Sequence, residues 1–160
     1  TAVTGDVYDA IPVTIPSTIT AAGLKSAKAA ILVWRNAVRL YDESMQSPGS
    51  DWKAKIRKYV GDPAAITQLT LLAALAKDGV HQIGALDYEG AIPHATAHNV
   101  EIRACVDISH FDVVNSAGDS VMEQNTPGRF YREYTIDFYP DAGHVWPLNL
   151  ITTAKPAQTC

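Results

Sequence analysis

Residues 98–108, with the sequence HNVEIRACVDI, decide the fold because apolar and polar side chains alternate along them. Successive side chains of a β-strand point to opposite faces of a sheet. One face carries the apolar residues Val100, Ile102, Ala104, Val106 and Ile108. The other face is polar apart from a cysteine and carries Glu101, Arg103, Cys105 and Asp107. This stretch therefore predicts a strand within a sheet that has one buried face.

The chain contains two cysteines, Cys105 and Cys160, which are two buried thiols, a disulfide or part of a metal site. A zinc site needs about four ligands at short spacings, and neither cysteine has such neighbours. Cys105 falls on the polar face of its strand, and Cys160 is the last residue, so a thiol has no packing role at either place. We expect a disulfide between them. Because disulfides persist outside the reducing cytosol, we also expect an extracytoplasmic location.

The length of 160 residues predicts a single domain, residues 18–160, preceded by an extended arm or tether, residues 1–17. A signal or lipid-anchor sequence would attach upstream of this arm. The net charge is −4 and the basic residues are scattered, which argues against nucleic acid as a partner. The longest apolar run, residues 29–34, is far shorter than the roughly 18 to 20 residues that cross a bilayer, so we expect no membrane span.

Three helices are expected before the strands. Residues 19–45 carry an apolar stripe at alternating spacings of three and four, and Asp42 is assigned to the opposite, charged side. The stripe consists of Leu24, Ala27, Ile31, Trp34, Val38, Tyr41 and Met45. Residues 51–60 form a second, short helix. The third, residues 62–77, begins at Asp62-Pro63 and is apolar on most sides, so it should be well buried.

After Gly79 the period of the pattern changes to that of strands. The expected strands are residues 81–89, 98–108, 130–139 and 144–153, with 111–114 continuing the second strand past a bend. Residues 140–143 form a tight turn. Helices followed by an antiparallel meander predict an α+β domain in which the helices cover one face of a curved sheet.

This order of elements resembles the nuclear-transport-factor-2-like (NTF2-like, also SnoaL-like) superfamily. The resemblance is carried by the helix around residues 34–41, the Asp62-Pro63 helix start and the strand, turn and strand of residues 134–151. EIRACVD (101–107), FDVVNSAGDSV (111–121), Trp146 and the closing Cys160 look like small secreted or lipid-anchored domains of actinobacteria and their phages. The resemblance covers about residues 18–160. It implies a cone, with three N-terminal helices packed in the concave face of an antiparallel sheet of four or more strands.

Enzymes of the similar fold, such as dehydratases and ketosteroid isomerases, use carboxylates and histidines inside the cone. In this chain the inward strand faces are almost wholly apolar, and the strand carboxylates belong to the outward set: Glu101, Asp107, Glu133 and Asp137. His94 and His98 have the spacing of helical metal ligands, but in a strand four residues span about 13 Å, too far for one ion. We therefore expect no catalytic residue, cofactor or metal.

Arg132 is the exception on the inward face, because it is in phase with the apolar residues of its strand. It either reaches the rim or lines the mouth of a pocket and pairs with an anionic ligand. The aromatic residues near it either fill the core or line an apolar cavity. The candidate pocket residues are Trp34, Tyr41, Arg132, Tyr134 and Phe138.

These observations favour a non-catalytic extracytoplasmic domain that binds an envelope component or another protein. A surface or phage-exclusion role follows only from the family resemblance. The first alternative is a binder of a small apolar or anionic ligand, or an isomerase- or dehydratase-like enzyme, that uses the concave pocket. The second is a homodimer formed through the outer sheet face, where Tyr131, Thr135 and Tyr139 lie.

Overall fold

β4 (Asn99–Asp107) lies at the centre of the main sheet, as its alternating pattern predicts. It pairs antiparallel with β3 and β6, and the apolar residues Val100, Ile102, Ala104 and Val106 are fully buried on one face.

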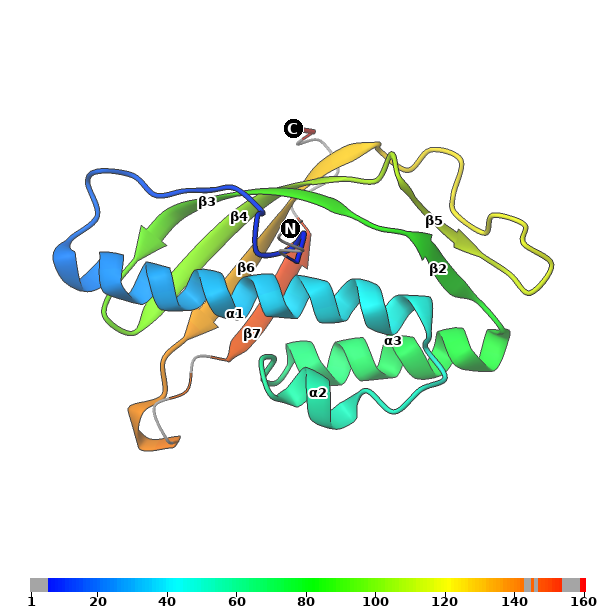
Figure 1. Cartoon of the computed structure of the whole chain (residues 1–160), viewed down its shortest axis with the longest axis horizontal. Coiled ribbons are helices and arrows are strands. Elements are labelled where there is room, and N and C mark those ends of the chain that lie inside the picture. Colours follow the sequence, from blue (N-terminus) through cyan, green and yellow to red (C-terminus); the bar gives the residue numbers. More distant parts are fainter. Residues whose placement is uncertain (1–5, 143–144, 146, 154–158) are drawn as a thin grey trace, which may run out of the picture.

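The computed structural model (Figure 1) describes residues 6–142, 145, 147–153 and 159–160. Its remaining elements are β1 (Val13–Thr14), α1 (Ala21–Gln46), α2 (Lys53–Arg57), α3 (Ala64–Asp78), β2 (His81–Gly84), β3 (Asp87–Ala95), β5 (Phe111–Val114), β6 (Arg129–Asp137), the 3₁₀ helix η1 (Pro140–Ala142) and β7 (Leu148–Thr153).

The strands form two sheets, which corrects the predicted topology. In the main sheet the order is β1-β3-β4-β6-β7, and β1 runs parallel to β3, so this sheet is mixed. β2 and β5 pair with each other in a second, two-stranded sheet. The predicted strand 81–89 is therefore two strands, and residues 111–114 leave β4 to pair with β2.

The α+β class is confirmed, but the predicted NTF2-like cone with a four-stranded antiparallel sheet is wrong. β1 precedes the helices and η1 follows β6, so the helices are not an N-terminal block. The main sheet does not curl into a cone around them (Figure 1). The physical reason is that residues 13–14, expected in a tether, add a parallel edge strand, while β2 and β5 form their own ribbon.

α1 crosses the buried face of the main sheet and supplies most of the helical side of the core (Figure 1). Thr20 caps its N-terminus by accepting a hydrogen bond of 3.1 Å from the backbone N–H of Gly23. Trp34 is fully buried, and its ring packs edge-on against those of Tyr88 and Tyr134, with centroids 6.0 and 5.7 Å away. This aromatic cluster fixes the helix on β3 and β6.

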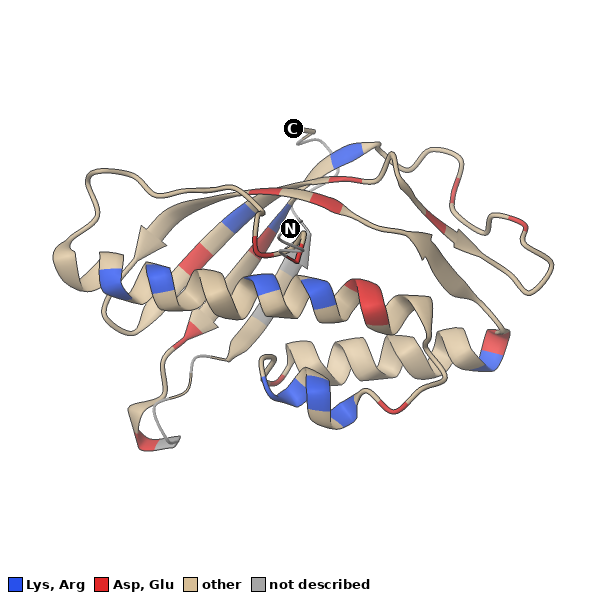
Figure 2. Cartoon of the chain, viewed as in Figure 1, with Lys and Arg blue, Asp and Glu red and all other residues tan. Residues whose placement is uncertain are grey.

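α3 is less buried than its apolar sequence predicted. Ala65, Gln68 and Leu72 face the core, but Ile66 is 53% exposed and Leu71 is 37% exposed. The prediction failed because an apolar composition does not say which side of a helix has a partner. Figure 2 shows that α3 carries charge only at its C-terminal end, in contrast to α2. Within the described part of the chain, none of the helices combines the length and the apolar character that crossing a bilayer requires.

Candidate functional site

A pocket of about 200 Å³ lies where α1, α3, β6 and β7 meet. Its described walls are mostly apolar, and Arg132 is the one ionised side chain among them. We call it the Arg132 pocket. It is lined by Tyr41, Pro63, Ala64, Thr67, Gln68, Leu71, Arg132 and Ile151.

The strand period places Arg132 in this pocket. Tyr134 and Ile136 are buried on the helix-facing side of β6, and Arg132 lies two residues earlier on the same face. Its guanidinium carbon lies 5.5 Å from the ring centroid of Tyr41 and 5.4 Å from that of Phe130. Arg132 thus lines the pocket and does not lie on the outer face of the sheet.

Ring faces, and not a carboxylate, hold the Arg132 charge. Each of the five ion pairs found among the described residues forms elsewhere in the molecule. Cation–π contacts of this kind stabilise a guanidinium without neutralising it. The pocket therefore presents a positive charge with free capacity for an anion.

A narrow inner chamber continues from the pocket toward the core. It has a volume of about 10 Å³ and shares Tyr41, Gln68, Arg132 and Ile151 with the outer cavity. The hydroxyls of Tyr88 and Tyr134 are buried here. The Tyr88 hydroxyl has no hydrogen-bond partner among the described residues, and the Tyr134 hydroxyl lies close to the Arg132 guanidinium. Burial raises the pKa of the Tyr134 hydroxyl, and the nearby Arg132 charge lowers it in part. Both phenols are therefore neutral at physiological pH and able to donate hydrogen bonds.

Gln68 is held in the pocket wall by a short chain of hydrogen bonds. Its Nε2 donates to Ser44 Oγ at 3.0 Å, and the Ser44 hydroxyl donates to the backbone carbonyl of Tyr41 at 3.0 Å. Gln68 and Ser44 are buried, so these bonds satisfy polar groups that cannot reach bulk water. The result is a fixed polar edge beside Arg132.

Asp42 is the functional candidate that sequence reasoning missed. It has no exposed surface, and its carboxylate accepts hydrogen bonds of 2.8 Å from Tyr8 Oη and from Gln82 Nε2. Burial raises its pKa, although both hydrogen bonds and the positive charge of Arg132 act in the opposite direction. A signal existed in the sequence, because Asp42 is four residues after Val38 and three before Met45, and so belongs to the apolar stripe. The assignment of Asp42 to the polar side is therefore wrong.

Only some of the residues predicted to form the pocket lie around it in the structure. It brings Tyr41, Arg132 and Tyr134 together around the cavity. Trp34 belongs to the core beside Tyr134 and lines neither chamber. Phe138 lies after β6, where its ring stacks on that of His98 with the centroids 6.1 Å apart.

The two histidines of HATAH are exposed. His94 lies in β3 and His98 follows it in the turn to β4. Within the described ranges, no group of three or more His, Cys, Asp or Glu residues is placed to hold a metal ion.

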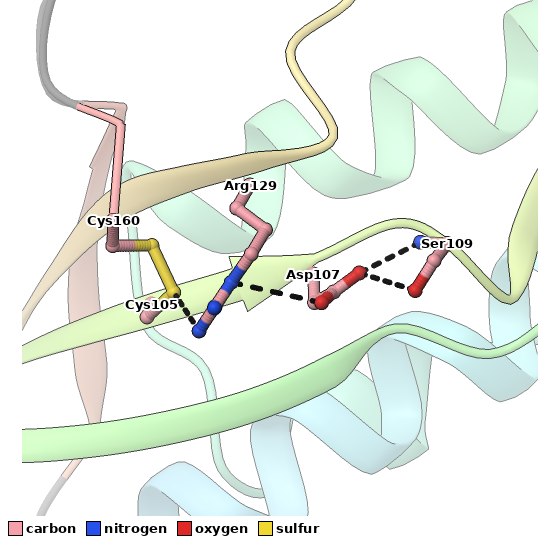
Figure 3. Close-up of a disulfide and its surroundings, with 5 residues drawn as sticks. All are labelled: Cys105, Asp107, Ser109, Arg129 and Cys160. Atoms are coloured by element: carbon pink, nitrogen blue, oxygen red, sulfur yellow. Dashed lines mark hydrogen bonds and ion pairs between the residues drawn. A yellow bond between two sulfur atoms is a disulfide. The ribbon is translucent and has the colours of Figure 1, made fainter.

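Cys105 and Cys160 form a disulfide (Figure 3). Cys105 is in β4, and Arg129 of β6 lies beside it with Nη2 3.2 Å from the Cys105 sulfur. Arg129 Nε also lies 3.6 Å from Asp107 Oδ2, and Asp107 accepts a hydrogen bond from the backbone N–H of Ser109. The predicted pairing is confirmed, and a disulfide of this kind indicates an oxidising, extracytoplasmic environment.

Comparisons with known proteins identify no family. No family model matches the chain, and no curated protein matches it. The intermembrane space region of the chloroplast protein ARC6 is 10% identical with a TM-score of 0.44, over 85% of this chain and 96% of that one. A de novo designed β-sheet protein solved by NMR is 12% identical with a TM-score of 0.31, over 83% and 87%. Neither likeness is strong enough to carry an argument. The comparisons do not show an NTF2-like family, and the actinobacterial and phage relationships stay predictions.

Proposed function

We propose that the protein is a non-catalytic binding domain that works outside the cytosol and holds a carboxylate in the Arg132 pocket. The carboxylate belongs to a small apolar acid or to the acidic end of an envelope component. The two sources share the chemistry that the pocket recognises, an anionic group on an apolar body. They are distinguished by the experiment below.

The observation that carries the proposal is the charge of Arg132 in a mostly apolar pocket. A buried charge is costly unless another group pairs with it, and a guanidinium is always protonated in proteins. Its planar fork matches a carboxylate, with two parallel N–H···O bonds. Among the described residues, the guanidinium lies beside the rings of Tyr41 and Phe130, and the nearby buried carboxylate of Asp42 forms no ion pair with it. An anionic ligand would supply a directly paired counter-ion inside the pocket.

The lining of the pocket supports binding over catalysis. A general base must lie within hydrogen-bond reach of the proton that it removes. The described lining residues include no Asp, Glu, His or Cys. Asp42 lines neither chamber, and Tyr8 and Gln82 already bond both of its oxygens. The isomerase- or dehydratase-like alternative therefore lacks a base at this site.

The size of the pocket sets the class of ligand. An engineered apolar cavity of about 150 Å³ accommodates benzene. The Arg132 pocket, at about 200 Å³, is therefore suited to an acid of the size of benzoate or hexanoate. Pockets for drug-sized ligands occupy roughly 300–1,000 Å³, so a steroid would not be enclosed.

The location is the second part of the proposal. The Cys105–Cys160 disulfide supports an oxidising compartment. Secretion, or attachment to the cell surface by a lipid anchor upstream of residues 1–17, would place the pocket where envelope components are accessible.

The test is ligand-dependent thermal stabilisation of the disulfide-bonded protein. Benzoate and hexanoate should raise the melting temperature in a saturable way, because a ligand that binds only the native state stabilises it by mass action. Benzamide, which lacks the charge, should not. Acetyl-Gly-Phe, which presents its carboxylate at a peptide end, separates the two sources: binding of the free acids alone identifies a small-acid binder, and binding of the peptide identifies a larger partner.

Two variants make this test specific. Arg132→Gln should abolish the stabilisation by benzoate. Arg57→Gln is the matched control, because Arg57 lies on α2 and pairs with Asp62 at 3.1 Å, outside the pocket. Equal responses to benzoate and benzamide, or an unchanged benzoate response in the Arg132 variant, would refute the proposal.

A further inference from the structure

The outward side of α3 is unusual for a surface helix. Surface helices ordinarily place charged residues opposite their buried stripe. No residue between Ala64 and Ala76 is charged, and the exposed positions include two large apolar side chains. These positions are Ile66, Thr67, Thr70, Leu71, Ala73, Ala74 and Ala76.

The neighbouring helix α2 is basic. Lys53, Lys55, Arg57 and Lys58 are all exposed. Figure 2 shows several blue bands on α2, in contrast to α3, which is coloured only at its C-terminal end. Arg57 pairs with Asp62. The ion pairs of the described residues do not include the three lysines, so their charges are available to a partner.

Two of these lysines lie over aromatic rings that are partly buried. Lys55 Nζ is 4.9 Å from the ring centroid of Trp52, and Lys58 Nζ is 5.2 Å from that of Tyr59. In each pair the ammonium lies over the ring face, a cation–π contact that leaves the lysine charge unneutralised and available to anionic headgroups. Trp and Tyr are themselves enriched at membrane–water interfaces.

The charge of the whole molecule is divided unequally. Residues 51–78 contain five of the 13 basic residues and three of the 17 acidic ones, and α1 contains four basic and two acidic residues. The helices are therefore positive, while the remaining residues are strongly negative. Near an anionic surface this asymmetry turns the helical side, which includes α2, toward the surface and the sheets away from it. We call the exposed residues of α2 and α3, with Trp52 and Tyr59, the α2–α3 face.

We infer that the α2–α3 face binds the surface of a lipid bilayer rich in anionic headgroups. The lysines of α2 contact the headgroups, and Ile66 and Leu71 of α3 enter the boundary between headgroups and acyl chains. A basic patch next to an apolar helical face is the combination that holds peripheral proteins in this layer. A protein partner is disfavoured, because the rings of Trp52 and Tyr59 are covered by lysines and the exposed side chains of α3 are mostly Ala and Thr. Protein interfaces are instead anchored by accessible aromatic or arginine side chains that enter fitted pockets.

The α2–α3 face shares Thr67 and Leu71 with the wall of the Arg132 pocket, but the inference does not require a ligand in that pocket. It is tested by flotation of the disulfide-bonded protein with lipid vesicles. Vesicles of phosphatidylglycerol and phosphatidylcholine in equal parts should bind the protein at about 10 mM salt, where charges act over about 30 Å. Binding should weaken strongly near 1 M salt, where that range falls to about 3 Å. Vesicles of phosphatidylcholine alone should not bind it. No binding to the anionic vesicles at low salt would overturn the inference.

Matched variants assign the binding to this face. Lys53→Glu with Lys55→Glu should reduce the affinity for the anionic vesicles by at least about tenfold, since each lysine contributes about one kcal/mol near an anionic surface. Lys25→Glu with Lys28→Glu makes the same charge change on exposed positions of α1 and should leave binding intact. Ile66→Ser with Leu71→Ser should weaken binding even at low salt. An equal loss in the α1 control, or no effect of the serine changes, would contradict the assignment; circular dichroism checks that each variant is folded.

Discussion

The Tyr8 hydroxyl donates a hydrogen bond of 2.8 Å to Asp42 Oδ2, so a residue of the N-terminal arm reaches a carboxylate that has no exposed surface. The arm is held at two further points. Asp6 pairs with Arg39 at 2.6 Å, and β1 pairs with β3. The residues expected to form a tether are therefore partly fixed on α1 and on the main sheet.

Tyr8→Phe should weaken this attachment. Removing a hydrogen bond to a charged group costs about 1.5–3 kcal/mol, and the buried Asp42 would keep only its remaining donors. We expect the free energy of unfolding, measured by urea denaturation, to fall within that range. Hydrogen exchange of residues 8–14 should become faster before the rest of the molecule is affected.

Tyr59→Phe is the matched control. The Tyr59 hydroxyl makes no hydrogen bond among the described residues, and its loss should change stability by less than about 0.5 kcal/mol. Equal effects of the two substitutions would show that the Tyr8 hydroxyl contributes nothing specific.

Asp42 should make stability depend on pH. Burial holds its pKa above the value of about 3.9 that an unfolded chain gives. A group with a raised folded-state pKa stabilises the protein most below its unfolded pKa, and this contribution is lost as the pH rises through the folded-state pKa. The free energy of unfolding of the wild type should therefore fall, relative to that of Asp42→Asn, as the pH rises from the unfolded-state pKa to the folded-state pKa of Asp42. At higher pH the difference between the two proteins should stay constant.

The measurement is a series of urea unfolding curves of both proteins across this pH range. Comparison with Asp42→Asn cancels the effects of Asp6 and Asp107, whose pKa values are lowered by hydrogen bonds and which act in the opposite direction. A difference between the two proteins that is constant with pH, or that changes with the opposite sign, would show that Asp42 is not the responsible group.

The disulfide should contribute a large part of the stability. Its cysteines are 55 positions apart, and closing a loop of that length removes chain entropy worth about 4 kcal/mol in the simple model. Cys105→Ser with Cys160→Ser should lower the free energy of unfolding by about this amount. The intact mass of unreduced native protein should also show both thiols oxidised. Two free thiols in that sample would remove the evidence for an extracytoplasmic location.

Gly84→Ala should be strongly destabilising. Gly84 has a φ of +69°, and a Cβ at this position would lie 1.9 Å from the backbone oxygen of His110. Left-handed backbone costs about 1–2 kcal/mol for a residue with a Cβ, and relief of the clash would separate β2 from β5, so we expect a loss above about 2 kcal/mol. Gly49→Ala, where a Cβ meets nothing within 4 Å, should be neutral or slightly stabilising. Equal melting temperatures of the two variants would contradict this account.

The sequence predicted features that depend on local periodicity. The alternation of residues 98–108 fixed β4 and its buried face, and the helical stripe around Trp34 placed α1 within two residues of its observed ends. The same period placed Arg132 on the inner face of β6, although only the structure shows that Tyr41 and Tyr134 meet there. The Cys105–Cys160 disulfide was predicted because neither cysteine has a packing role at its position and neither has the neighbours that a zinc site needs.

Features that depend on distant partners could not be predicted. Nothing within residues 13–14 indicates a parallel pairing with β3, and nothing within residues 111–114 indicates pairing with β2. The exposure of α3 depends on what covers it, which its apolar sequence does not contain. Asp42 has a signal in its spacing, but a carboxylate is costly to bury unless hydrogen bonds satisfy it. The bonds from Tyr8 and Gln82 come from distant parts of the chain and are not encoded in the local pattern.

The covalent link from Cys160 to β4 also determines how the molecule responds to mechanical load. Tension applied to the last residue passes through the sulfur atoms directly into the central strand. β5, β6 and β7 lie between the two cysteines in sequence and are therefore outside the path of the force. Under stretching by both chain ends, these strands would lengthen the molecule only after the disulfide is reduced.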